Sequence, residues 1–388
     1  MFLTILSCSY GGGHRRVAEV IAEEWRARIG GRVEVIDYFT RFANPRFDAA
    51  TRFWYYQTIR FAPGLQRRFY DFMGEIRPDS WFRRAVNRTG MERLHRYLTD
   101  ERPDVVCCVH WTFSGTMSDL RAAGRTAVPC LTVITDYVGH GEWIHPHMDR
   151  YAVPHDAMQD HLRRRGVSAG RIIVSGIPVE PKFDRGPDRA TLMAQLGLTP
   201  GVPVVLVMAG AYAALGRVDD LVRVLARFPR PIQPLVVCAN APRLARRVRA
   251  LTTRSSHLFR VLGYVTNVDE LMTVADLLLT KAGGVTVSEA LMKTLPMLLY
   301  GSIPGQEESN TAFLVGQGAA VAATTAVEVR EALSTLLARP ERLAAMRGVA
   351  ARLRRPDAAR VVVAQLAELA ADPGRRTARR PPAVTTDA

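Results

Sequence analysis

Four short motifs combine glycines with side chains that can bind anions, transfer protons or bind hydroxyl groups. Each motif follows a short apolar run and precedes a stretch with helical periodicity. Side chains at such strand-to-helix turns lie at the carboxyl edge of a parallel sheet, where ligands bind. The four motifs are Ser9–His14, Ile134–His140, Thr280–Glu289 and Ile303–Asn310.

The first motif, Ser9-Tyr-Gly-Gly-Gly-His14, predicts an anion site. Gly12 and Gly13 let the backbone approach a ligand closely. The helix that follows would direct its unpaired N–H groups and the positive end of its dipole at that ligand. The spacing matches neither the P-loop nor the dinucleotide fingerprint. The structural alternative is a tight turn with an exposed His14.

The second motif places Asp136 and His140 directly after a predicted strand, and Trp143, His145 and His147 follow them. A carboxylate and imidazoles close together can transfer protons or bind a metal. The spacing does not fit one helical face, which argues against zinc. Asp136 is the better acid–base candidate, and a polar loop is the alternative for each histidine.

The third motif is a second glycine turn that leads into a helix. Gly283 and Gly284 form the turn, and Thr286 falls in the first helical turn. Glu289 lies about one turn further, where its carboxylate could accept hydrogen bonds from two ribose hydroxyls. The alternative is that Glu289 interacts only with the helix dipole.

The fourth motif supplies amide and carboxylate groups in a small space, from Gln306, Glu307 and Asn310. Sugars are recognised by such groups because these donate and accept hydrogen bonds in pairs. A polar loop before a helix is the alternative.

Stepping along the chain, short apolar runs alternate with amphipathic helical stretches, which predicts parallel sheets covered by helices. The predicted strands are Leu3–Ser9, Val33–Ile36, Val105–Val109, Leu131–Thr135, Ile172–Ser175, Val204–Met208, Pro234–Cys238, Phe259–Leu262, Leu277–Thr280 and Met297–Tyr300. The strands and helices fall into two series, and the boundary between the series lies near residues 181–187. We therefore predict domains at residues 1–183 and 184–372, and a disordered basic tail at 373–388.

The chain has 388 residues and a net charge of +15. This surplus attracts nucleic acid, an anionic membrane surface or phosphorylated substrates. Its five cysteines show no metal-ligand spacing. We expect them to be buried thiols of a protein in a reducing compartment. No apolar run reaches the roughly 20 residues that span a bilayer, and no basic leader precedes the first strand. A cytoplasmic protein that can touch a membrane is predicted.

Residues 44–96 are rich in arginine and aromatic side chains, including Trp54, Tyr55 and Tyr56. This mixture suits the membrane interface, where rings lie at headgroup depth and arginine meets phosphate. It also suits single-stranded nucleic acid. Helices that pack their aromatic side chains inward are the structural alternative.

Taken together, these motifs resemble the monogalactosyldiacylglycerol synthase and processive diacylglycerol glucosyltransferase family. The resemblance covers residues 1 to about 340. Its elements are Gly11–His14, Val133–Asp136 with His140 and Trp143, Gly176–Val179, Gly263–Val265, Asp276, Lys281–Gly284, Ser288–Ala290 and Pro304–Glu307 with Asn310.

The resemblance implies a GT-B fold, in which two Rossmann-like domains enclose an interdomain cleft. It also implies inverting transfer with no metal and no other cofactor. His14 and Asp136 would lie on the acceptor side, and one of them would be the base. His140, Trp143, Trp54, Tyr55 and Tyr56 would contact the acceptor or the membrane. The donor would contact Gly12, Gly13, Gly210, Tyr264, Val265, Gly283, Gly284, Thr286, Glu289, Gln306, Glu307 and Asn310.

One segment departs from the family pattern. The loop after the first strand of the second domain is glycine-rich in the family, whereas residues 208–216 contain only Gly210 and Gly216. Such a loop approaches a diphosphate less closely.

The sequence thus predicts a hexosyltransferase that uses UDP-glucose or UDP-galactose and makes a β-linked glycolipid on diacylglycerol or a glycosyl-diacylglycerol. It would act peripherally at the anionic inner face of the cell membrane and bind no nucleic acid. The alternatives are an enzyme that uses UDP-N-acetylglucosamine, either a lipid-intermediate transferase or a 2-epimerase, and a nucleic-acid-binding protein.

Overall fold

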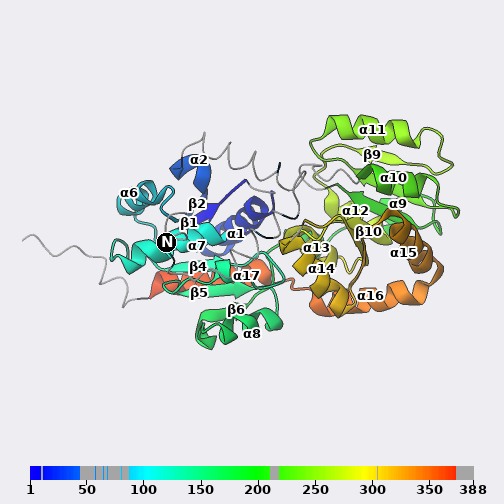
Figure 1. Ribbon diagram of the computed structural model, residues 1–388. Helices are drawn as coiled ribbons and strands as arrows, with labels where there is room; N and C mark the ends of the chain where they lie inside the picture. Colours follow the sequence, from blue (N-terminus) through cyan, green and yellow to red (C-terminus); the bar gives the residue numbers. More distant parts are fainter. Residues whose placement is uncertain are drawn as a thin grey trace, which may run out of the picture.

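The computed structural model describes residues 1–9, 12–43, 87–209, 218–303 and 305–372, together with residues 57, 64, 68 and 80. Two lobes stand side by side, and each is built on a parallel six-stranded sheet with helices packed around it (Figure 1). The predicted pair of doubly wound α/β units is confirmed.

The first sheet has the strand order β2-β1-β3-β4-β5-β6. Its strands are β1 (Phe2–Ser7), β2 (Arg32–Asp37), β3 (Val105–Cys108), β4 (Cys130–Val133), β5 (Arg150–Val153) and β6 (Ile172–Val174). The helices of this part of the chain are α1 (Gly13–Ile29), α2 (Tyr38–Phe42), α6 (Met91–Glu101), α7 (Trp111–Ala122) and α8 (Asp156–Arg164), with short 3-10 turns at Gly141–Trp143, Ala169–Arg171 and Pro181–Phe183.

The second sheet has the order β12-β11-β10-β7-β8-β9. Its strands are β7 (Val204–Met208), β8 (Gln233–Val237), β9 (Arg260–Leu262), β10 (Leu277–Thr280), β11 (Met297–Tyr300) and β12 (Ala320–Ala323). The remaining helices are α9 (Arg189–Gln195), α10 (Val218–Ala226), α11 (Pro242–Thr252), α12 (Val268–Val274), α13 (Gly284–Met292), α14 (Gln306–Gln317), α15 (Ala326–Ala338), α16 (Pro340–Leu353) and α17 (Ala358–Ala371).

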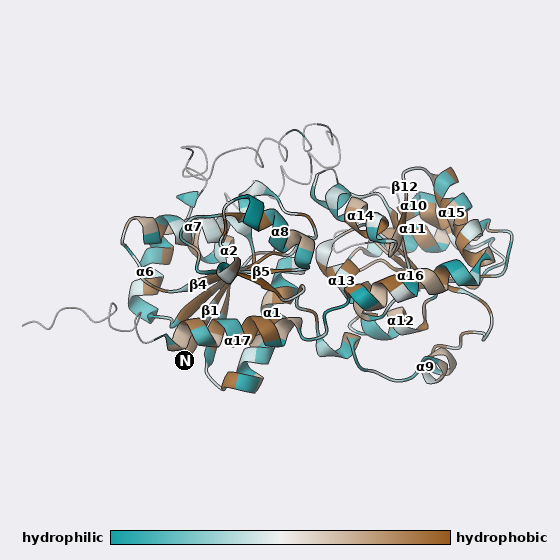
Figure 2. Cartoon of the chain, turned by 90° about the horizontal axis from the view of Figure 1, so that it is seen from below, coloured by the Kyte–Doolittle hydropathy of each residue, from teal (hydrophilic) through white to brown (hydrophobic). Residues whose placement is uncertain are grey.

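The central strands are continuous apolar runs because helices cover both faces of each sheet. In β1, Leu3, Ile5 and Leu6 are completely buried, and Val204–Val207 of β7 are buried in the same way. Figure 2 shows apolar strands inside each lobe and, around them, helices in which hydrophobic and hydrophilic residues alternate. One apolar cluster contains buried residues of both lobes, so the lobes share a core.

The last helix, α17, returns to the first lobe. It packs against α1, β3 and β4 and buries Val362, Val363 and Leu366 there (Figure 1). The sequence placed residues 184–372 in one C-terminal domain, whereas the packing of α17 joins this helix to the first sheet. In the sequence, the apolar stripe of α17 shows that the helix is amphipathic, but it does not show which lobe the helix packs against.

Among the described residues, no helix is long and apolar enough to cross a membrane.

Candidate active site

Each sheet has a switch point where the strand order changes direction, and the two switch points carry the predicted motifs. In the first sheet this point lies between β1 and β3, and in the second between β7 and β10. Ligands of doubly wound folds bind at the carboxyl ends of the strands that flank such a point. His14 follows β1, and Lys281–Gly284 follow β10.

The amino ends of α1 and α13 meet between the lobes. A Cβ added to Gly13 would lie 3.2 Å from Val285 Cγ2, and one added to Gly284 would overlap the backbone oxygen of Thr135. Both glycines therefore allow the lobes to approach each other. Two positive helix ends also converge here, which favours an anion between them.

Asp136 joins the predicted acceptor side to the predicted sugar site. Its side chain is 5 % exposed, and its Oδ1 accepts hydrogen bonds from Gln306 Nε2 and, at 3.5 Å, from Asn310 Nδ2. Gln306 begins α14 in the second lobe, whereas Asp136 follows β4 in the first. The structure thus brings together three residues that the sequence assigned to one site.

Burial raises the pKa of Asp136 to about 6, because a carboxylate loses hydration inside the protein. Hydrogen bonds from Gln306, Asn310 and Trp143 act in the opposite direction, and the nearby Glu142 carboxylate adds to the rise. A buried carboxyl group with such a pKa can accept a proton near neutral pH.

His14 lies beside this network at the start of α1. Its Nδ1 is 3.3 Å from Thr135 Oγ1, and its ring also hydrogen-bonds the Val109 backbone. Desolvation lowers the pKa of His14 to about 4, so the imidazole is neutral at neutral pH. The His110 ring meets it edge-on, with ring centroids 5.0 Å apart.

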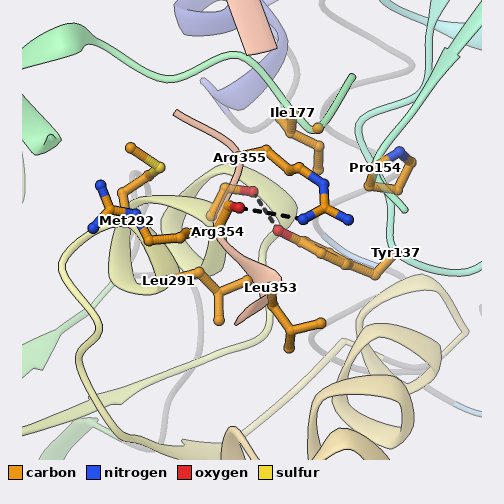
Figure 3. Close-up of a pocket in the computed structure, with 10 residues that line it drawn as sticks. Tyr137, Pro154, Ile177, Leu291, Met292, Leu353, Arg354 and Arg355 are labelled. Atoms are coloured by element: carbon orange, nitrogen blue, oxygen red, sulfur yellow. Dashed lines mark hydrogen bonds between the residues drawn. The ribbon is translucent and has the colours of Figure 1, made fainter. Parts of the chain in front are cut away.

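Tyr137, the residue after Asp136, binds the second lobe through backbone, hydroxyl and ring. Its N–H donates to Asn310 Oδ1 at 2.8 Å, and its hydroxyl lies 2.8 Å from Ser288 Oγ. Its ring stacks on Phe313 of α14. Figure 3 shows the Tyr137 hydroxyl in a pocket beside Arg355, where the chain returns to the first lobe. These contacts fix Asp136 relative to α14.

Glu307 was predicted to bind sugar hydroxyls, but both of its carboxylate oxygens already have partners. Lys281 Nζ pairs with Oε1, and the Ile303 N–H donates to Oε2 at 2.9 Å. Its side chain is also buried. Glu307 therefore anchors the start of α14 to the Lys281 turn, and Gln306 is the more accessible amide beside Asp136.

The predicted nucleotide side is built from α13 and the turn after β9. Tyr264 is 61 % exposed, so its ring is available for stacking, and Val265 is half-buried beside it. Thr286 is half-buried in the first turn of α13, and Glu289 lies deeper at 9 % exposed. The charged groups that influence Glu289 are Arg16, Glu180, Lys182 and Asp269.

Glu289→Gln should stabilise the protein at alkaline pH. Burial raises the pKa of Glu289 to about 8, from 4.5 when it is exposed. The native state therefore holds this proton more tightly than the unfolded state, and wild-type stability falls as pH rises from about 4.5 to 8. Each pKa unit is worth about 1.4 kcal/mol, so the loss amounts to a few kcal/mol. Thermal unfolding at pH 5 and pH 9 measures it.

The uncharged glutamine removes this dependence, so the Tm advantage of the variant should grow with pH. The exposed Glu331, changed to Gln, is the matched control and should show no such trend. An advantage of Glu289→Gln that is equal at both pH values contradicts the prediction.

Two predicted acceptor residues lie deeper than expected. Trp143 was expected at the acceptor or membrane surface, but it is 3 % exposed within the first-lobe core and hydrogen-bonds Asp136. His140 is half-buried, with Nδ1 3.2 Å from Glu142 Oε1. Gly12 is at the α1 N-cap with a left-handed φ of 79°. Gly210, Trp54, Tyr55 and Tyr56 lie outside the described residues.

Several site residues were missed in the sequence analysis. His110 follows β3 at the switch point, caps α7 and contacts Trp111 and Phe113. Its position after the predicted strand Val105–Val109 is a signal that could have identified it. Thr135 contacts His14 within the first lobe and Gly284 of the second lobe. Nothing in the sequence marks the contact with Gly284, which forms only when the lobes meet.

Known protein families match both lobes. The model of the monogalactosyldiacylglycerol (MGDG) synthase family matches residues 14–179, and that of the glycosyltransferase family 28 C-terminal domain matches residues 239–362. The chain is 31 % identical to a processive diacylglycerol beta-glucosyltransferase of Bacillus cereus, with 95 % of this chain and 94 % of the relative covered. The enzyme of the same name from Bacillus subtilis is 29 % identical, with 88 % of each chain covered.

Solved structures agree on the fold. Acinetobacter baumannii MurG aligns with a TM-score of 0.62 at 14 % identity and covers 95 % of this chain and 99 % of its own. The S. aureus MnaA-UDP co-structure aligns at 0.63 with 14 % identity and covers 93 % and 94 %. These matches confirm the GT-B fold. The family models and the sequence relatives establish that the chain belongs to the monogalactosyldiacylglycerol synthase and processive diacylglycerol glucosyltransferase family of GT-B glycosyltransferases.

Proposed function

We propose that this glycosyltransferase moves glucose or galactose from a UDP-sugar to diacylglycerol, or to a glycosyl-diacylglycerol, with inversion at the anomeric carbon. The observation that carries the proposal is the hydrogen-bonded group of Asp136, Gln306 and Asn310. It sets a candidate base from one lobe against candidate sugar-binding amides from the other. The names of the Bacillus relatives support diacylglycerol as the acceptor and favour glucose as the first sugar to test.

In the proposed reaction, Asp136 accepts the proton of the acceptor hydroxyl as its oxygen attacks the anomeric carbon. The bond between that carbon and the UDP oxygen breaks, and the diphosphate takes the electron pair. The N–H groups at the start of α13 stabilise the developing charge on UDP. A single displacement on the opposite face turns the α-linked sugar of the donor into a β-linked product.

We also propose that the transfer requires no metal. Two helix N-termini converge at the expected diphosphate position, and preorganised N–H groups of this kind stabilise a leaving group without a cation. No Asp-x-Asp motif occurs in a loop suited to binding a metal diphosphate.

For the acceptor, we propose that diacylglycerol is reached at an anionic membrane surface. The net charge of +15 favours approach to such a surface. Around His110, the partly buried rings of Phe39 and Trp111 give the acceptor edge of the first sheet an apolar character that suits a glycerolipid. We propose that this surface is the inner face of the cell membrane.

The direct test gives purified protein diacylglycerol in anionic vesicles and, in separate reactions, UDP-glucose, UDP-galactose and UDP-N-acetylglucosamine. We expect UDP release with at least one hexose donor, a β-linked glycolipid by mass spectrometry and NMR, and unchanged rates in EDTA. Vesicles without diacylglycerol are the control. Release of UDP with neither hexose, or a product with UDP-N-acetylglucosamine alone, would overturn the proposal.

A further inference from the structure

A cluster of three metal-ligand side chains lies at the switch point of the first sheet. Cys8 follows β1, His14 begins α1, and His110 follows β3. One donor atom from each residue, a sulfur and two imidazole nitrogens, lies within 4.8 Å of the other two. His110 is far from Cys8 and His14 in the sequence, so only the fold brings the three residues together.

The donor set has a defined chemical preference. One thiolate and two imidazoles suit Zn²⁺ and similar thiophilic cations, whereas Mg²⁺ and Ca²⁺ require oxygen ligands. Zinc lies about 2.3 Å from sulfur and about 2.0–2.1 Å from imidazole nitrogen. Atoms within 4.8 Å of one another reach this geometry through small side-chain movements towards a common centre.

The surroundings of both imidazoles permit such movements. The contact of His14 Nδ1 with Thr135 Oγ1 is long, at 3.3 Å. The His14 ring also hydrogen-bonds the Val109 backbone. This bond can orient the imidazole, as outer-shell partners do in metal sites. His110 Nδ1 accepts the Thr112 N–H, also at 3.3 Å. Binding through His110 Nε2 moves the ring proton to Nδ1, so this long hydrogen bond from Thr112 is given up when the metal binds.

The three residues differ in burial. Cys8 is buried, whereas His14 and His110 are half-buried. Three protein ligands leave the fourth tetrahedral position for water. The two half-buried histidines, rather than the buried Cys8, are the ligands nearest to solvent.

We propose that Cys8, His14 and His110 form a binding site for a thiophilic divalent cation of the Zn²⁺ class, and that its occupation inhibits the enzyme. Binding replaces the thiol proton of Cys8, which leaves to solvent, by a sulfur–metal bond. The cation then holds His14 and blocks the space beside Asp136. Inhibition rests on the proposed transferase function, whereas binding does not.

The binding test titrates metal-free protein with Co²⁺, which gives a thiolate charge-transfer absorption and tetrahedral visible bands, and then displaces it with Zn²⁺. We expect one ion per chain and one proton released per Zn²⁺. Cys8→Ser and His110→Gln should weaken binding by more than the roughly 10- to 100-fold that outer-shell partners are worth. The charge-transfer band should disappear in Cys8→Ser.

Cys238→Ser is the matched control, because Cys238 is a buried thiol of the second lobe. It should bind Co²⁺ and Zn²⁺ as the wild type does. Far-UV circular dichroism checks that each variant folds, and His14→Gln replaces any variant that does not. Absence of a thiolate band in folded wild-type protein, or its loss in Cys238→Ser but not in Cys8→Ser, would overturn the site.

The inhibition test compares transferase rates with and without Zn²⁺ for each variant. Wild type and Cys238→Ser should lose activity over the Zn²⁺ range that fills the site, EDTA should restore it, and Cys8→Ser should resist. Inhibition that is equal in Cys8→Ser contradicts the inhibitory role. If no variant transfers sugar, the proposed function fails and the spectroscopic titration still decides whether the site exists.

Discussion

Asp136→Asn should lower kcat by roughly 10²- to 10⁴-fold, the range that a general base contributes. The substitution keeps the shape of the side chain, and its amide oxygen can still accept the hydrogen bonds from Gln306 and Asn310. It removes only the ability to take a proton. Affinity for UDP should stay within about threefold of the wild-type value, because UDP is expected to bind at α13. Single-turnover transfer and calorimetric UDP titration measure the two quantities.

The pH profile adds a second readout for Asp136. Because its pKa is raised to about 6, the group is protonated below that pH, and wild-type kcat/KM should rise from pH 5 to pH 7. The residual activity of Asp136→Asn should lack this limb. Asp160→Asn makes the same change at an exposed carboxylate and should leave rate and profile unchanged. A drop of less than tenfold for Asp136→Asn would remove Asp136 as the base.

Gly284→Ala should reduce transfer by about 100-fold or more, because the new methyl group would overlap the backbone oxygen of Thr135. Backbone atoms cannot rotate away as a side chain can, so the lobes must separate. Opening here stretches the hydrogen bonds of Asp136 and Tyr137 with α14. A displacement of about 1 Å at reacting groups can cost about 100-fold in rate.

The control for this change is Gly316→Ala, within α14 of the same lobe. A Cβ at Gly316 meets no atom within 4 Å, and alanine favours a helix, so activity and stability should be retained. The Gly284→Ala protein should fold and, by small-angle X-ray scattering with UDP present, should be more open than the wild type. Wild-type kinetics in Gly284→Ala would show that the lobes need not approach this closely during the reaction.

The strands that the sequence predicts well are those with long apolar runs. β7, β10 and β11 have the predicted bounds, since Val, Leu and Met fill them and glycine or proline follows. β5 and β12 were missed. Arg150-Tyr-Ala-Val and Ala320-Val-Ala-Ala have only four residues each, and the second is mostly alanine, which is depleted in strands. Pairing with a neighbouring strand determines their structure.

The site was predictable where one motif supplies both the turn and the chemical group, as for His14, Asp136 and Gln306. It was not predictable where a role depends on a contact with a side chain of another element. The ion pair with Lys281 makes Glu307 an anchor, and the hydrogen bond to Asp136 accompanies the burial of Trp143 in the core. Motif spacing carries no information about such contacts.

The return of α17 to the first lobe constrains how the chain can fold during synthesis. The apolar surface of α1, β3 and β4 that α17 covers stays uncovered until the ribosome has made α17. Until then, the nascent first lobe exposes the sites for Val362, Val363 and Leu366 while the second lobe is already available to fold. A fragment that ends after the first sheet would keep this apolar groove open to water and to chaperones, so the lobe encoded first is the one completed last.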